Sequence, residues 1–155
     1  MRLRPLIAAL GLVLAGPTMA VTCTSTTNWY SLGPPGLEVF GQSFGSVGSY
    51  TDCYSFSLSS AADSFGGTWS IDPWLNQLDL TVGSVTLFSG GLLGNQTTGG
   101  FITADSTPGS FSFTSLSAGT YTLAVASKVT SDWGFTNDRV GYLGVIATTG
   151  ASVAS

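Results

Sequence analysis

Residues 50–58 read YTDCYSFSL, and this stretch decides the class of fold that the sequence predicts. From Tyr54 to Leu58, aromatic and aliphatic residues alternate with serines. Successive side chains of a strand point to opposite faces, so the apolar residues share one face and the serines share the other. The stretch therefore predicts a strand with one face on a core and a hydroxyl-rich face in water.

The same alternation recurs along the chain, and no sustained helical period follows residue 20. The sequence predicts strands near residues 22–30, 37–44, 50–59, 67–71, 76–82, 85–89, 101–104, 110–116, 120–129 and 140–147. Many short strands separated by frequent turns are typical of an all-β fold. We expect residues 21–155 to form a single antiparallel β-sandwich with jelly-roll-like connections.

Glycines mark the expected turns. Gly83-Ser84 interrupts an alternating run, and the apolar parity reverses at Val85. Glycine supplies the positive φ that a two-residue type II′ loop requires, so we expect a hairpin there. The sequence GPPG at residues 33–36 predicts a break between strands, and the glycine pairs at 90–91 and 99–100 bracket an expected flexible loop.

Residues 1–20 have the layout of a secretory signal peptide. Arg2 and Arg4 precede an apolar run of eleven residues at 6–16, and small residues lead up to Ala20. A bilayer span needs about twenty apolar residues. A buried N-terminal helix is the alternative. We expect cleavage after Ala20, a secreted, periplasmic or extracellular location, and no membrane span in the remaining chain.

The small number of charged residues excludes some classes of function. The 155 residues contain four lysines and arginines, eight acidic residues and no histidine, for a formal charge of −4. Loss of Arg2 and Arg4 with the leader would make it −6 and leave Lys128 and Arg139 as the basic residues. Nucleic-acid binding requires clustered basic residues, so it is not expected. Without histidine, the commonest general base and metal ligand are missing.

Cys23 and Cys53 are the two cysteines of the chain. In an exported protein a disulfide between them is the default. Closing a loop of that length would contribute about 3–4 kcal/mol by the chain-entropy model. Two free catalytic thiols are the alternative, which the missing histidine disfavours.

Asp52 shares its parity with Tyr50, Tyr54 and Phe56, so it is expected to face inward. A buried carboxylate needs a partner. One interpretation is a structural ion pair with Arg139 or a bound cation. A second is that the strand starts or bulges here and leaves Asp52 at a wet edge. A third is that Asp52 caps backbone amides of a neighbouring loop.

Two other groups of oxygen-bearing residues are candidate calcium ligands: Asp63, Asp72 and Asp79, and Asp132, Asn137 and Asp138. Neither follows the order of a calcium-binding loop. Residues that satisfy the backbone of local turns are the simpler interpretation. We expect no cofactor, with calcium as the alternative. An enzyme is not expected, although spatially paired aspartates could in principle build a hydrolase.

The chain has four tryptophans: Trp29, Trp69, Trp74 and Trp133. Trp74 and Trp133 fall in expected loops, where exposed rings could stack on sugars. The alternative is that each ring plugs an end of the sandwich. These two residues are the candidate ligand-binding pair.

Several segments carry a family resemblance. Tyr50–Phe56 has the form aromatic–x–Asp–x–aromatic ahead of a strand, and Val85–Phe88, Phe111–Leu116, Ala118–Leu123 and Gly141–Gly144 follow in order. Over residues 37–147 the chain resembles exported FxDxF-type PEP-CTERM proteins of Gram-negative bacteria, and also bacterial pre-peptidase-type β-sandwich modules. Tyrosine stands where that family's name has phenylalanine.

That family carries a C-terminal sorting tail with a Pro-Glu-Pro motif, an apolar helix and arginines. Residues 148–155 show none of these, so we expect a soluble exported relative. The expected function is a non-enzymatic structural or adhesive role in the bacterial envelope or extracellular matrix. The alternative is a carbohydrate-binding module that uses loop aromatics. Extracellular polysaccharide and other envelope proteins are the candidate partners. A purely structural role predicts no deep polar pocket.

Overall fold

The structure is a computed structural model that describes residues 20–71, 78–131 and 139–151. The expected signal peptide, apart from Ala20, lies outside these residues, as do Trp74 and Trp133. None of the described residues forms a helix long and apolar enough to cross a membrane.

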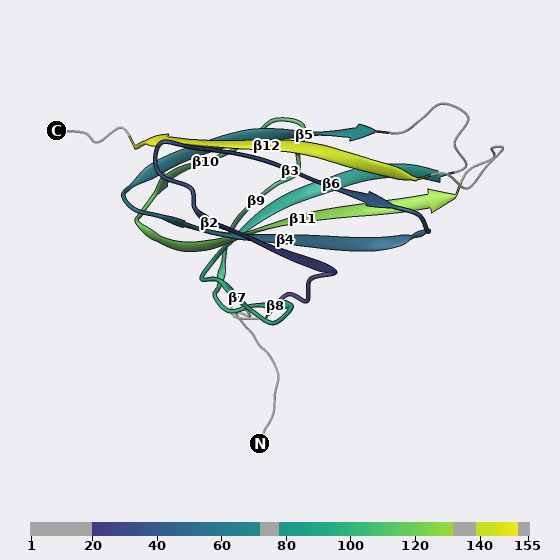
Figure 1. The fold of residues 1–155 in the computed structure, drawn as a ribbon, viewed down its shortest axis with the longest axis horizontal. Coiled ribbons are helices and arrows are strands. Elements are labelled where there is room, and N and C mark those ends of the chain that lie inside the picture. The colour runs from purple at the N-terminus through teal and green to yellow at the C-terminus, as the bar shows by residue number, and fades with distance from the viewer. Residues whose placement is uncertain (1–19, 72–77, 132–138, 152–155) are drawn as a thin grey trace, which may run out of the picture.

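Two β-sheets pack face to face, so the predicted β-sandwich is confirmed (Figure 1). The first sheet has the order β10 (Phe111–Leu116), β5 (Ala62–Ile71), β12 (Val140–Gly150) and β3 (Gly36–Phe44). The second has the order β2 (Ser25–Ser31), β4 (Gly48–Leu58), β11 (Gly119–Ser131), β6 (Leu78–Ser89) and β9 (Phe101–Asp105). Most successive strands alternate between the sheets, as in a jelly roll.

The predicted hairpin at Gly83-Ser84 is wrong. Residues 78–89 form one strand, β6, that pairs with β11 throughout. Ala126 lies opposite Ser84 and Ser127 lies opposite Val82, so Gly83 is an extra residue without a partner on β11. Such a bulge shifts the strand by one residue, so the apolar parity reverses while the chain continues in the same direction.

Three further features differ from the prediction. β2 pairs with β4 in parallel, so the sandwich is not purely antiparallel. β5 begins at Ala62 rather than near residue 67. The glycine-bracketed loop contains a small hairpin, β7 (Leu92–Leu93) and β8 (Gln96–Thr97), that projects from the second sheet (Figure 1).

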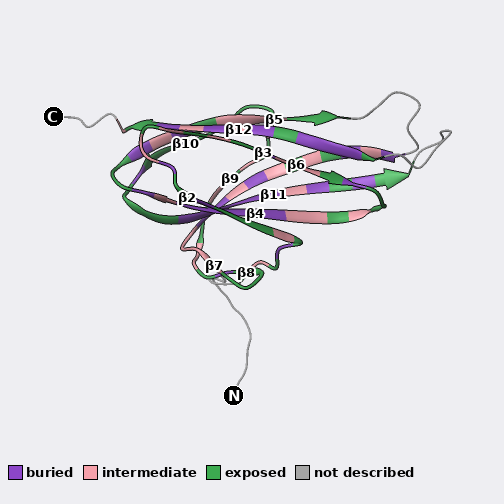
Figure 2. Cartoon of the chain, in the orientation of Figure 1, coloured by how far each residue is buried: buried purple, intermediate pink, exposed green. Residues whose placement is uncertain are grey.

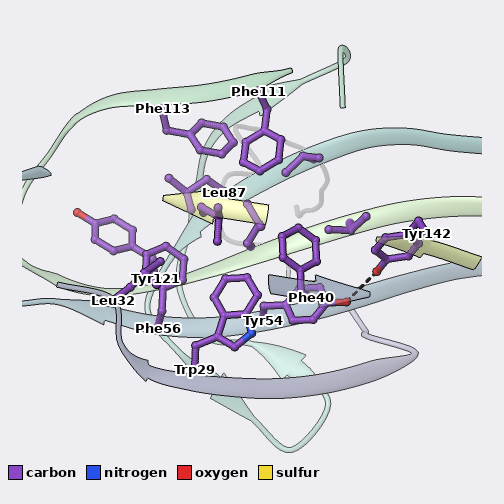
Figure 3. Close-up of a cluster of buried hydrophobic side chains, with 14 of the residues drawn as sticks. Trp29, Leu32, Phe40, Tyr54, Phe56, Leu87, Phe111, Phe113, Tyr121 and Tyr142 are labelled. Carbon is purple, nitrogen blue, oxygen red and sulfur yellow. Dashed lines mark hydrogen bonds between the residues drawn. The ribbon is translucent and has the colours of Figure 1, made fainter. Parts of the chain in front are cut away.

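Aromatic rings fill the space between the sheets (Figure 3). Trp29 of β2 stacks on Tyr54 of β4, with ring centroids 4.8 Å apart, and lies 5.3 Å from the ring of Phe40 on β3. Buried residues follow the inward positions of the strands, while both outer surfaces carry many exposed ones (Figure 2). Burial of these large rings supplies much of the apolar area that stabilises the fold.

Candidate functional site

Asp52 lies in the middle of β4 and is 1% exposed. β4 pairs with β11 without interruption from Gly48 to Leu58, so the strand neither starts nor bulges at Asp52. The predicted inward orientation is therefore confirmed, and the wet-edge interpretation is wrong.

Hydroxyl groups from both sheets hold this carboxylate. Ser25 Oγ donates to Oδ1 at 2.7 Å, and the Tyr142 hydroxyl donates to Oδ2 at 2.7 Å. Tyr142 and Tyr54 hydroxyls lie 2.8 Å apart, as the dashed line in Figure 3 shows. Because Tyr142 gives its single proton to Asp52, Tyr54 is the donor in that bond. Gln42 Nε2 donates to Ser25 Oγ at 3.2 Å and extends the network to β3.

Burial sets the charge behaviour of this network. It raises the pKa of the Asp52 carboxyl above its usual range, and the hydrogen bonds from Ser25 and Tyr142 offset part of that effect. Burial also raises the pKa of the Tyr54 and Tyr142 hydroxyls. The two tyrosines stay neutral and act as hydrogen-bond donors. Because Tyr54 lies on β4 and Tyr142 lies on β12, the network joins the two sheets.

Arg139 lies elsewhere. Its Nη2 donates to the Ser43 carbonyl oxygen at 3.2 Å and to the Ser43 hydroxyl at 3.1 Å. The structure thus gives Asp52 two hydroxyl partners and places Arg139 against β3. The donors to Asp52 are side chains rather than the backbone amides of a loop.

Two of the other described aspartates accept backbone amides. Asp63 Oδ1 accepts the Ser115 amide at 2.7 Å, and Asp105 Oδ1 accepts the Thr107 amide at 2.8 Å. The hydrogen bond from the Thr107 hydroxyl, together with those from the Thr107 and Ser112 amides, lowers the pKa of Asp105. Within the described residues no three His, Cys, Asp or Glu side chains gather as a metal site. Asp72, Asp132, Asn137 and Asp138 lie outside the described residues.

The outer surface of the first sheet carries a group of apolar side chains. We call six exposed large apolar side chains on it the apolar face: Leu37 and Val39 of β3, Phe65, Trp69 and Ile71 of β5, and Leu143 of β12. The strand register makes them neighbours, because Leu143 lies opposite both Gly41 and Trp69, and Gly141 lies opposite Ile71. Trp69 is 59% exposed, whereas Trp29 is buried in the core.

The outer surface of the second sheet carries the disulfide. Cys23 and Cys53 are bonded, as predicted, across a separation of 30 residues. They pack with Phe88, Ala124 and Leu92 in a small second core. The Cys23 amide donates to the Asn95 carbonyl at 2.7 Å. The N-terminal segment and the β7–β8 hairpin are thereby fixed over β4 and β11.

A depression of about 500 Å³, which we call the polar hollow, lies between that hairpin and β2. Its lining consists of Thr26, Thr27, Asn28, Tyr30, Ser31, Ser55, Phe56, Ser57, Gly91, Leu92, Gly94 and Thr120. Most of these residues carry hydroxyl or amide groups. A purely structural role predicts no deep polar pocket, and this depression is open to solvent.

Neither a family model nor a curated protein sequence matches the chain. Its fold is similar to that of Aeromonas hydrophila PliG, a periplasmic inhibitor of g-type lysozyme. The two sequences are 10% identical and the TM-score is 0.44, and the match covers 81% of this chain and 100% of that chain. A PliG mutant from Escherichia coli gives 14% identity and a TM-score of 0.41 over 81% and 98%.

The pre-peptidase C-terminal domain of a Bacillus anthracis collagenase gives 15% identity and a TM-score of 0.33, over 77% of this chain and 93% of that chain. At these identities and TM-scores, neither function nor binding residues carry over to this chain. The resemblance to FxDxF-type proteins stays a prediction.

The sequence predicts the inward position of Asp52 and the disulfide, but it does not predict the apolar face or the polar hollow. A signal for the first was present. Residues 142–146 read YLGVI, a run that is apolar at both parities apart from one glycine. Such runs indicate strands with two apolar faces. No local signal marked Tyr30 or Ser25, because their neighbours are set by the pairing of β2 with β4.

Proposed function

We propose that this protein is an exported, non-enzymatic structural protein of the bacterial envelope or extracellular matrix that self-associates through its apolar face. The observation that carries the proposal is the exposure of six large apolar side chains on one sheet surface. Contiguous exposed apolar patches on soluble proteins are typical of interaction sites. The occupant that we propose is a second copy of this chain.

The size of the surface suits a dimer. The apolar face lies on three of the four strands of the first sheet, β3, β5 and β12. The whole outer surface of that sheet, four strands spaced about 4.8 Å apart with about nine residues each rising about 3.3 Å, covers about 600 Å². Two whole sheet surfaces would bury about 1,200 Å², the lower end of the range for stable protein interfaces. Side chains that project from the sheet add to that area.

The chemistry of the surface also suits a copy of itself. A two-fold interface requires one patch to supply both projections and recesses. Leu143 and Ile71 project beside Gly41 and Gly141, and these residues line a depression of about 630 Å³. The six side chains of the apolar face are uncharged, and the depression beside them is also lined by Arg139, which is basic.

The non-enzymatic part of the proposal rests on the side chains available. The chain has no histidine. Asp52, the most unusual carboxylate, is enclosed between the sheets with two hydroxyl donors, so a substrate has no access to it. The alternative of a carbohydrate-binding module built on Trp74 and Trp133 stays a prediction, because both residues lie outside the described part of the chain.

Self-association is tested by sedimentation equilibrium of the protein of residues 21–155, with its disulfide formed, across a dilution series. We expect a concentration-dependent dimer, and we expect Leu143→Lys to be monomeric. Leu93→Lys is the matched control, since Leu93 is equally apolar and 77% exposed but lies on the β7–β8 hairpin. A wild type that is monomeric throughout, or a Leu143→Lys variant that dimerises as the wild type does, would overturn the proposal.

A further inference from the structure

We infer that the polar hollow on the second sheet is a binding site for neutral carbohydrate. It lies on the opposite sheet from the apolar face and shares no residue with it. The inference is therefore independent of self-association. Its volume of about 500 Å³ falls within the usual range of ligand sites.

Covalent and hydrogen bonds fix the walls of the hollow. One wall is the β7–β8 hairpin, whose Thr97 amide donates to the Val21 carbonyl at 3.1 Å, while the Val21 amide donates to Thr97 Oγ1 at 2.9 Å. The Gly90 amide donates to the Thr120 carbonyl at 2.8 Å. Together with the disulfide, these bonds hold the hairpin against β4 and β11. A recess built in this way keeps its shape before a ligand arrives, which lowers the entropic cost of binding.

Tyr30 forms the other wall and has an unusual backbone. Its φ is 61°, in the left-handed region that bulky residues rarely adopt. The register of β2 against β4 shifts between Asn28 and Ser31, so Tyr30 is part of an irregularity in the strand. The Tyr30 amide donates to Asn28 Oδ1 at 2.7 Å, which supports this conformation. Backbone strain of this kind clusters at binding sites, and bulges re-aim side chains.

The strained backbone presents the tyrosine ring to solvent. Tyr30 is 74% exposed, the most exposed of the aromatic residues that the structure describes. Nothing in the core requires this ring, because Trp29 beside it supplies the packing against Tyr54 and Phe56. A conformational cost without a packing gain points to a role in binding.

The lining selects the class of ligand. None of its twelve residues is charged, so the hollow offers no charged complement to a phosphate, a carboxylate or a cation. The Asn28 amide and the hydroxyls of Ser55 and Thr120 match sugar hydroxyls as donors or acceptors, while Ser57, whose hydroxyl donates to the Tyr30 carbonyl at 3.3 Å, can still accept. An aromatic face stacks on the apolar face of a sugar ring. An extended peptide is less suited, because the irregularity at Tyr30 interrupts the edge of β2 on which it would pair.

The test measures binding of the protein of residues 21–155, with its disulfide formed, to an array of defined neutral oligosaccharides. Sulfated and uronic-acid oligosaccharides on the same array are the anionic comparison. We expect at least one neutral oligosaccharide to bind. We expect Tyr30→Gly to bind it at least about tenfold more weakly, since a stacking contact is lost. Trp69→Ala is the control, because it removes an exposed ring from the other sheet.

Tyr30→Gly also separates binding from folding. Glycine adopts positive φ without strain, so this variant is expected to melt no lower than the wild type while it loses binding. Binding of no neutral oligosaccharide would overturn the inference. So would tighter binding of the anionic oligosaccharides, an unchanged affinity in Tyr30→Gly, or an equal loss in Trp69→Ala.

Discussion

Replacing Asp52 with asparagine tests the buried network, because asparagine keeps the shape and removes the charge. In the wild type, burial raises the pKa of this carboxyl, so the folded state holds the proton more tightly than the unfolded state does. The contribution of Asp52 to stability is therefore greatest at low pH. It falls as the pH rises from the unfolded pKa, about 4, through the folded pKa.

Proton linkage and the hydrogen bonds to Asp52 set how much the free energy of unfolding changes. Within that window the free energy of unfolding falls by up to about 1.4 kcal/mol per pH unit because of Asp52. Above it, the ionised carboxylate depends on Ser25 and Tyr142 as donors. Tyr142→Phe should then cost about 1.5–3 kcal/mol in the wild type, but about 0.5–1.5 kcal/mol in Asp52→Asn, where the lost bond has no charged partner.

The assay is urea unfolding, followed by circular dichroism, of the four proteins of this double-mutant cycle from pH 4 to pH 8. The difference between wild type and Asp52→Asn isolates this carboxyl, since Asp105 and the other acidic groups are common to both. Parallel stability curves for the two proteins would refute the assigned pKa shift. An equal cost of Tyr142→Phe in both backgrounds would refute the assigned hydrogen bond.

Two further predictions concern stability. Reducing the Cys23–Cys53 bond should lower the free energy of unfolding by about 3–4 kcal/mol, because the bond closes a loop of 30 residues. The double substitution Cys23→Ala with Cys53→Ala should have the same effect. Thermal melts that do not change on reduction would contradict this prediction. Gly66→Ala should destabilise by at least about 2 kcal/mol, because the added Cβ would lie 2.1 Å from the Val145 carbonyl oxygen. Gly150→Ala is its control, with nothing within 4 Å, and equal melting temperatures of the two variants would show that β5 yields at no cost.

The sequence predicts the position of Asp52 but not its partners, because the position depends on neighbouring residues and the partners are distant in the chain. The parity of Asp52 is a local property, so YTDCYSF was enough to place the carboxylate inward. Its donors come from residues 27 and 90 positions away, on β2 and β12. Nothing near Ser25 or Tyr142 in the chain marks them as partners, and the sequence instead suggested Arg139. The exposed Tyr30 ring depends in the same way on an irregular pairing of β2 with β4.

The amino-acid sequence alone determined the all-β class, most of the strand positions and the pairing of Cys23 with Cys53. Each of these follows from local periodicity or from the number of cysteines. Only the tertiary structure decided which sheet each strand joins, that β2 runs parallel to β4, and that Gly83 is a bulge rather than a turn. A reversal of apolar parity fits both a hairpin and a bulge, and the choice depends on whether a distant strand, here β11, continues to pair across it.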